Sequence, residues 1–170
     1  MALIWKLGNQ VEFELKTGTF ESTLDDKGRV VIPASLRDRY TGKLVITQGK
    51  EKTVWIIPSA TYEKLLLKFK KGLEDNNLSS EEIEAFMYQH ESTAFSVEID
   101  TKTGRIPVPA FLRSYANLSK ECLIVSINNH IEIWNADLHR TFMEEVRLIN
   151  KNTHKKLLGK INLFSDEDDE

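Results

Sequence analysis

GRVVIPASLR (residues 28–37) is the stretch that decides the fold, because it returns later in the chain as GRIPVPAFLR (residues 104–113). Six of the ten positions are identical, and the offset is 76 residues throughout, without a gap. Self-similarity at one fixed spacing indicates tandem copies of a single structural unit. The chain is therefore predicted to contain the same small fold twice.

Around the first copy, the pattern predicts a strand, a tight turn and a return strand. Residues 20–24 form the first strand, and the turn Asp25-Asp26-Lys27-Gly28 follows, with Gly28 supplying a positive φ. Residues 29–32 form the return strand, and Pro33 begins a short helix because its missing N–H costs little there. Each copy should thus present a turn between two short strands.

Each copy then continues into a second apolar hairpin and a helix. The hairpin strands are expected at 43–47 and 54–57 in the first copy, and at 123–127 and 131–134 in the second. Short polar residues that can cap a helix follow both hairpins. Ser59 precedes a helix over 60–71, and Asn135 or Asp137 precedes one that reaches about Leu148.

Between the copies, residues 71–77 break the pattern, and a second linking helix should begin at Ser79 or Ser80 and reach about Gln89. Glu82 stands at capping-box spacing from Ser79. A unit of about 50 residues has a core that is too small for good stability on its own, so the halves should pack together.

Charge is distributed unevenly along the chain. The net charge is −3, but the last six residues hold five acids, and without these acids it becomes +2. A mildly basic body is compatible with nucleic acid, although a charge of +2 is weak for a lone DNA binder. We expect the acidic end to be a solvated, disordered tail.

Nothing in the composition indicates export or membrane insertion. The only cysteine, Cys122, lies in an apolar run, where we expect a buried small hydrophobic residue in a reducing compartment. The start of the chain lacks a long apolar segment, and no stretch approaches the roughly 18 apolar residues of a membrane span. We expect a cytoplasmic protein with no membrane partner.

The segment TLDDKGRVVIPASLR (residues 23–37) resembles the first signature of the MraZ family, and residues 104–113 match the second. The ending NHIEIW (residues 129–134) is also similar, so the resemblance spans roughly residues 18–145. It implies a β-rich α+β fold in which two AbrB-like (SpoVT-AbrB) swapped-hairpin units in tandem form one pseudo-twofold, barrel-like body. Linker helices and flexible terminal tails would complete the chain.

The expected divisions are an N-terminal extension (1–17), a first unit with its trailing helix (18–71), and a linker with a helix (72–91). A second unit with its trailing helix (92–148) and a basic, then acidic tail (149–170) follow.

The resemblance also implies a sequence-specific transcription regulator without cofactor, metal or small-molecule substrate. Such a protein binds short direct repeats of double-stranded DNA in the promoter of the division and cell-wall gene cluster. It forms a ring-shaped homo-oligomer, and we expect it to be associated with the nucleoid. Head-to-tail contacts close into rings when the rotation permits, and a ring would multiply weak contacts.

The candidate DNA-binding residues lie on the turns and on the short helices behind them. A β-ribbon fits the major groove, where arginine matches guanine bidentately, whereas lysine suits phosphates. The candidates for DNA contact are Lys27, Arg29, Lys102, Arg105, Arg37 and Arg113, and the motif residues that shape the turns are Asp25, Gly28, Asp100 and Gly104. Arg37 and Arg113 could equally form salt bridges between subunits.

The family motif Asp-x-x-x-Arg fits Asp25 and Arg29, but the second copy has one extra residue between Asp100 and Arg105. The second turn is therefore predicted to be longer or bulged. Alignment on the glycines sets Thr101, rather than Asp100, opposite Asp25. A structural alternative is that Asp25 closes an Asx-turn and that Arg29 pairs with Asp100 of the other half.

Competing interpretations are weaker. Catalysis would rest on Asp25, Asp26 and Asp100 alone, and the four histidines have no metal-ligand spacing, so we expect no enzyme. Trp55 and Trp134 occupy corresponding strands, where core packing is the expected use. An AbrB-like antitoxin or protein-interaction module remains the alternative, because the tail from Lys151 could contact a partner.

Overall fold

The computed structural model describes residues 4–7, 11–14 and 16–160. The chain divides into a first unit, Met1–Asn135, which we call the body, and a second unit that begins at Ala136. The strands are β1 (Ile4–Leu7), β2 (Val11–Glu14), β3 (Gly18–Thr23), β4 (Arg29–Val31), β5 (Leu44–Gln48), β6 (Val54–Pro58), β7 (Phe95–Val97), β8 (Arg105–Pro107), β9 (Glu121–Ile127) and β10 (His130–Asn135). The helices are α1 (Ala34–Arg37), α2 (Ser59–Asp75), α3 (Ser80–Ser92), α4 (Ala110–Tyr115) and α5 (Ala136–Leu158).

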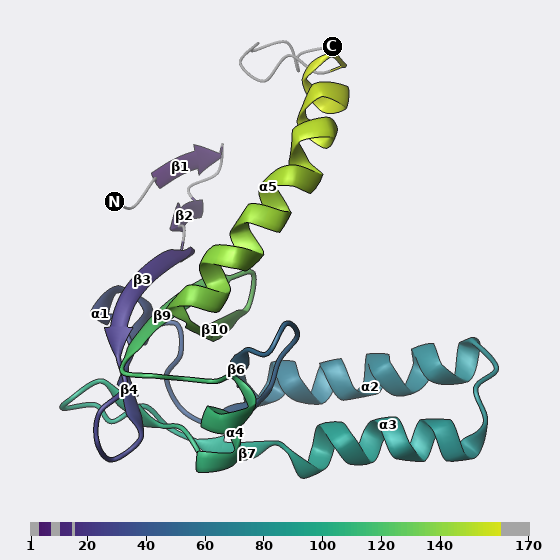
Figure 1. The fold of residues 1–170 in the computed structure, drawn as a ribbon, viewed down its shortest axis with the longest axis horizontal. Coiled ribbons are helices and arrows are strands. Elements are labelled where there is room, and N and C mark those ends of the chain that lie inside the picture. Colours follow the sequence, from purple (N-terminus) through teal and green to yellow (C-terminus); the bar gives the residue numbers. More distant parts are fainter. Residues whose placement is uncertain (1–3, 8–10, 15, 161–170) are drawn as a thin grey trace. The chain divides into compact units, whose positions relative to one another are not determined.

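The two halves of the body exchange strands in one six-stranded antiparallel sheet (Figure 1). The strand order is β3-β9-β10-β6-β5-β7, so the first strand of each half lies against the hairpin of the other half. At the centre of the sheet, β10 pairs with β6, with Ile131 opposite Ile56. The equivalent strands of the two repeats are β3 and β7, β5 and β9, and β6 and β10, and each pair lies at the same distance from the two ends of the sheet. This arrangement confirms a β-rich α+β fold with pseudo-twofold symmetry.

The return strands β4 and β8 form a separate two-stranded ribbon. Val30 and Ile106 are paired directly, and both are fully buried. Because side chains alternate along a strand, their neighbours along the ribbon lie on the opposite, outward face. The ribbon thus joins the halves a second time and turns one face to solvent.

The core lies between the ribbon, the short helices and one face of the sheet. Leu36 of α1 and Leu112 of α4 occupy equivalent positions and are both buried. Cys122 is buried as well, as predicted. Trp134 is 2% exposed, and Trp55 packs partly buried against a smaller cluster around Tyr62, which confirms core packing for both tryptophans.

Helices α2 and α3 run side by side as a helical hairpin that links the halves (Figure 1). Phe69 meets Phe86 edge to face at 5.3 Å between ring centroids. The predicted capping box is confirmed, because Ser79 and Glu82 each accept the other's backbone N–H. The predicted cap of α2 by Ser59 is wrong: Pro58 holds the N-cap position, and the Ser59 hydroxyl donates to the Lys43 carbonyl instead.

Both expected tails contain regular structure. Strands β1 and β2 form an antiparallel pair within the predicted N-terminal extension. Helix α5 continues beyond the predicted end near Leu148 to Leu158, since no proline or glycine interrupts it before Gly159. The acidic end, residues 165–170, lies outside the described residues.

Candidate nucleic-acid interface

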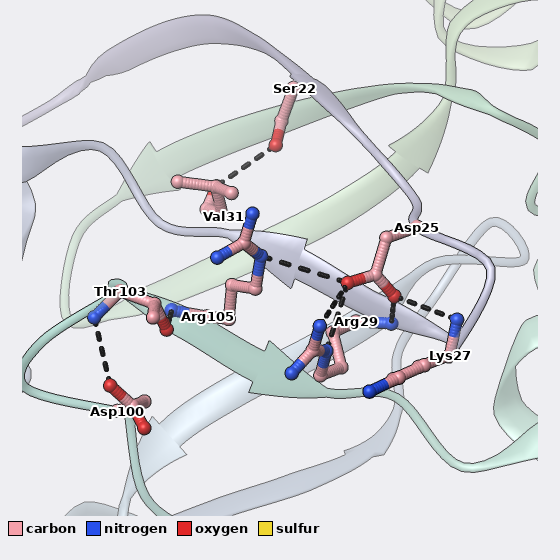
Figure 2. A network of polar contacts seen from close by, with 8 residues as sticks. All are labelled: Ser22, Asp25, Lys27, Arg29, Val31, Asp100, Thr103 and Arg105. Carbon is pink, nitrogen blue, oxygen red and sulfur yellow. Dashed lines mark hydrogen bonds and ion pairs between the residues drawn. The ribbon is translucent and has the colours of Figure 1, made fainter.

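The first turn is built around the side chain of Asp25 (Figure 2). Its Oδ1 accepts hydrogen bonds from the backbone N–H groups of Lys27 (3.0 Å) and Arg29 (2.9 Å). The Gly28 N–H donates to the Asp25 carbonyl at 3.0 Å, and Gly28 has φ +74°. Asp25 therefore closes an Asx-turn, and this turn fixes where Lys27 and Arg29 leave the backbone.

The second turn uses Asp100 in the same way but is one residue longer. Asp100 Oδ1 accepts from the backbone N–H groups of Lys102 and Thr103, each at 2.8 Å. The Gly104 N–H donates to the Asp100 carbonyl at 2.8 Å, so the turn spans five residues where the first spans four. The predicted longer turn is confirmed, and Asp100 rather than Thr101 is the structural equivalent of Asp25.

One carboxylate oxygen forms ion pairs with both ribbon arginines (Figure 2). Arg29 contacts Asp25 Oδ2 through Nε and Nη2, each at 2.8 Å. Arg105, from the other half, places its Nε 3.6 Å from the same Oδ2. The suggested pairing of Arg29 with Asp100 is therefore wrong: the ion pair between the halves runs from Arg105 to Asp25.

Hydrogen bonds stabilise the ionised form of Asp25. The backbone N–H of Arg29, followed by its side chain, holds the pKa of this carboxyl below its usual range. The pKa of Asp100 is also lowered, by the backbone N–H groups of Thr103 and Lys102. Both carboxyls therefore stay ionised to a lower pH than a free aspartate does.

On the outward face of the ribbon, the two arginines lie on neighbouring strands at diagonal positions, not directly opposite each other. Arg29 lies opposite Pro107, and Arg105 lies opposite Val31. The arginine side chains are 36% and 38% exposed, so each keeps part of its guanidinium in reach of a ligand. Lys27 and Lys102 are exposed on the two turns beside them. Four cationic side chains from both halves thus lie on or beside one strand ribbon.

Arg37 and Arg113 each donate to a backbone carbonyl of their own half and pack against a turn of the other half. Arg37 donates from Nε to the carbonyl of Ile32, and Arg113 donates from Nη1 to the carbonyl of Val108, each at 2.7 Å. Each guanidinium lies over the turn glycine of the opposite half: Arg37 over Gly104, and Arg113 over Gly28.

The half-buried placement of Arg37 and Arg113 favours a structural role, while phosphate contact by either stays a prediction. Residue-by-residue reasoning missed this reciprocal packing. A signal was present, since in both copies an arginine follows the glycine at the same spacing, nine residues on.

The close approach of Arg113 makes Gly28 the more sensitive of two comparable glycines. Gly28→Ala would force an alanine into the left-handed φ region. The new Cβ would also lie 2.0 Å from the nearest nitrogen of the Arg113 guanidinium and would displace it. At Gly42 (φ +77°), a Cβ would meet nothing within 4 Å. We expect Gly42→Ala to lower the free energy of unfolding by about 1 kcal/mol and Gly28→Ala by about 2–3 kcal/mol.

Urea unfolding followed by tryptophan fluorescence would measure both changes. Equal losses in the two variants would show that the Arg113 contact contributes nothing beyond the backbone strain.

Other site types have little support within the described residues. No group of three or more His, Cys, Asp or Glu side chains among them is arranged to hold a metal ion. In the part of the chain that the structure describes, the helices are too short or too polar to cross a membrane.

Comparison with known proteins supplies the last observation on this site. A family model described as "MraZ protein, putative antitoxin-like" matches residues 15–85 and again residues 92–159. A protein of Symbiobacterium thermophilum named "Transcriptional regulator MraZ" is 37% identical over 128 residues, covering 75% of this chain and 89% of the relative. Proteins with the same name from Lactiplantibacillus plantarum and Saccharopolyspora erythraea are 36% and 33% identical, again over 75% of this chain and over 87% and 86% of their own lengths.

Proposed function

Because the chain belongs to the MraZ family, we propose that it is a transcription regulator that binds double-stranded DNA and prefers particular sequences. The observation that carries the proposal is the pair of half-exposed arginines, Arg29 and Arg105, fixed on the outward face of the β4·β8 ribbon. The names of the relatives agree with such an activity.

The ribbon suits the major groove of B-DNA. A two-stranded ribbon fits this groove, where a guanidinium can bind O6 and N7 of guanine, a contact worth about 1–3 kcal/mol of discrimination. In our proposal Arg29 and Arg105 bind base edges, while Lys27 and Lys102 bind the flanking phosphates. The protein would work on the nucleoid in the cytoplasm without a catalytic step.

Binding through several copies would compensate for the modest charge of each body. Glu98 and Asp100 border the same surface depression as the two arginines, so a single ribbon offers limited attraction to phosphates. A ring-shaped homo-oligomer would present one ribbon per subunit at a regular spacing, and short direct repeats would match that spacing. We propose the promoter of the division and cell-wall gene cluster as the target.

A second candidate function is a protein-interaction or antitoxin-type module. The observation in its favour is the last part of α5, where four large apolar side chains are exposed: Leu148, Ile149, Leu157 and Leu158. Exposed apolar side chains along one helix are typical of a partner-binding segment. A stoichiometric protein that copurifies with the chain, and is lost when these four are replaced by serine, would support this candidate.

The direct test is fluorescence anisotropy of the purified protein on its own upstream promoter DNA, against a scrambled duplex, at two salt concentrations. We expect tighter binding to tandem repeats than to a single repeat, and affinity that falls as salt rises. Equal affinity for promoter and scrambled DNA, or no binding at low salt, would refute the regulator assignment. Tight binding by a monomer to one repeat would refute only the ring.

A further inference from the structure

We propose that Asp25 is the positioning residue for both guanidiniums of the ribbon, so that one carboxylate sets the sequence preference of the whole reading surface. This inference rests on the proposed function and adds to it a division of labour between two aspartates that the repeat places in equivalent positions. Asp25 contacts both arginines, whereas Asp100 shapes its own turn and makes no ion pair with either of them.

The two oxygens of Asp25 have separate tasks. Oδ1 accepts the backbone N–H groups of Lys27 and Arg29 and so builds the turn. Oδ2 faces the two guanidiniums, at 2.8 Å from Arg29 and 3.6 Å from Arg105. Figure 2 shows both arginine side chains directed towards this carboxylate from different strands. Removing the charge on Oδ2 while keeping Oδ1 would therefore release both arginines without opening the turn.

Asp100 lacks the second task. Its Oδ1 accepts the backbone N–H groups of Lys102 and Thr103, as Asp25 Oδ1 does in the first turn. Within the described part of the chain, however, Asp100 forms no ion pair with any arginine or lysine, and Arg29 acts on it only through its charge, as the smallest of the causes that lower the Asp100 pKa. The extra residue in the second turn separates Asp100 from Arg105, which reaches across to the first half instead.

Fixed guanidiniums matter because base recognition depends on their orientation. An arginine that is already ordered loses less side-chain freedom on binding, and its planar fork then meets only suitably placed acceptors. Arg105 contacts Asp25 through Nε, so both of its terminal nitrogens stay available for a guanine. The carboxylate at the same time repels phosphates, so Asp25 strengthens discrimination between sequences and weakens binding to DNA in general.

These opposite effects allow a sharp test with two variants of equal charge. Asparagine keeps the Oδ1 acceptor in both turns, so Asp25→Asn and Asp100→Asn each remove one negative charge and preserve the turn. Anisotropy on the upstream promoter and on a scrambled duplex gives the ratio of the two affinities for each protein. This ratio does not depend on the folded fraction, because the same sample binds both DNAs.

We expect both variants to bind scrambled DNA somewhat more tightly than the wild type does, by similar factors. Asp25→Asn should lower the ratio about tenfold or more, whereas Asp100→Asn should leave it within about twofold of the wild type. NMR gives an independent readout, since the Nε–H signals of Arg29 and Arg105 should be dispersed in wild type and in Asp100→Asn. In Asp25→Asn they should move to the position of freely rotating arginines.

One possible result is that the wild type prefers the promoter while both variants show the same ratio as the wild type. That result would overturn the inference and leave the proposed function standing. A wild-type ratio near one would overturn the proposed function and, with it, the role of Asp25 in recognition. Unchanged Arg105 signals in Asp25→Asn would show that only Arg29 depends on this carboxylate, which also overturns the shared role.

Discussion

The double variant Arg29→Ala/Arg105→Ala is expected to lose at least about 30-fold in affinity for the upstream promoter and nearly all preference over scrambled DNA. Each guanine contact contributes about 1–3 kcal/mol of discrimination, so losing two removes about 2–6 kcal/mol from one subunit alone. An assembly that carries several ribbons would lose more, because the deficit recurs in each copy. The same anisotropy titration, at one fixed salt concentration, measures this loss.

A matched control separates recognition from charge. Arg140→Ala/Arg147→Ala removes two exposed arginines from α5, away from the ribbon in sequence, and leaves the same net charge. We expect a small drop in affinity that is equal for both DNAs. A similar pattern in Arg29→Ala/Arg105→Ala would mean that the ribbon arginines bind phosphates only, and the base-reading role would have to be abandoned.

The largest expected effect on stability comes from Ile106→Ala. Ile106 is fully buried and lies directly opposite Val30 at the centre of the ribbon, so truncation leaves a cavity between the halves. Large-to-small changes of this kind cost about 2–5 kcal/mol, which is a substantial part of the 5–15 kcal/mol that typically holds a domain together. Because the ribbon carries both arginines, promoter binding should fall at temperatures where the wild type still binds.

Ile127→Ala provides the comparison, because the same chemical change is made at the end of β9, where the side chain is 37% exposed. We expect a loss below about 1 kcal/mol there, since little area leaves the core. Chemical denaturation with circular dichroism measures both values. Similar losses at the two sites would show that the ribbon is not part of the cooperative core.

The duplicated stretch was sufficient to predict two equivalent units, the turns at Asp25 and Asp100, and the longer second turn. These features are local, because glycine, proline and aspartate restrict the backbone within a few residues. The partner of Arg105 could not be found in this way. Its carboxylate belongs to the other half, and sequence spacing says nothing about a contact across 80 residues.

Helix ends show the same division between local and non-local causes. The capping box at Ser79 and Glu82 is a local exchange of hydrogen bonds, and it was predicted correctly. Ser59 is a residue type that often caps a helix, yet its hydroxyl donates to the carbonyl of Lys43, the residue directly before β5, because the start of α2 lies beside that carbonyl. Tertiary neighbours can thus redirect a side chain whose local preference is clear.

Strand exchange in the central sheet also determines when the protein can fold during its synthesis. When the first half has left the ribosome, β3 lacks its neighbour β9, and β5 lacks its neighbour β7. Such unpaired edges are open to other chains until the second half emerges. Residues up to about Asn135 must therefore be translated before the body can close, and a ribosome that stalls between the repeats would leave a nascent chain exposed to aggregation.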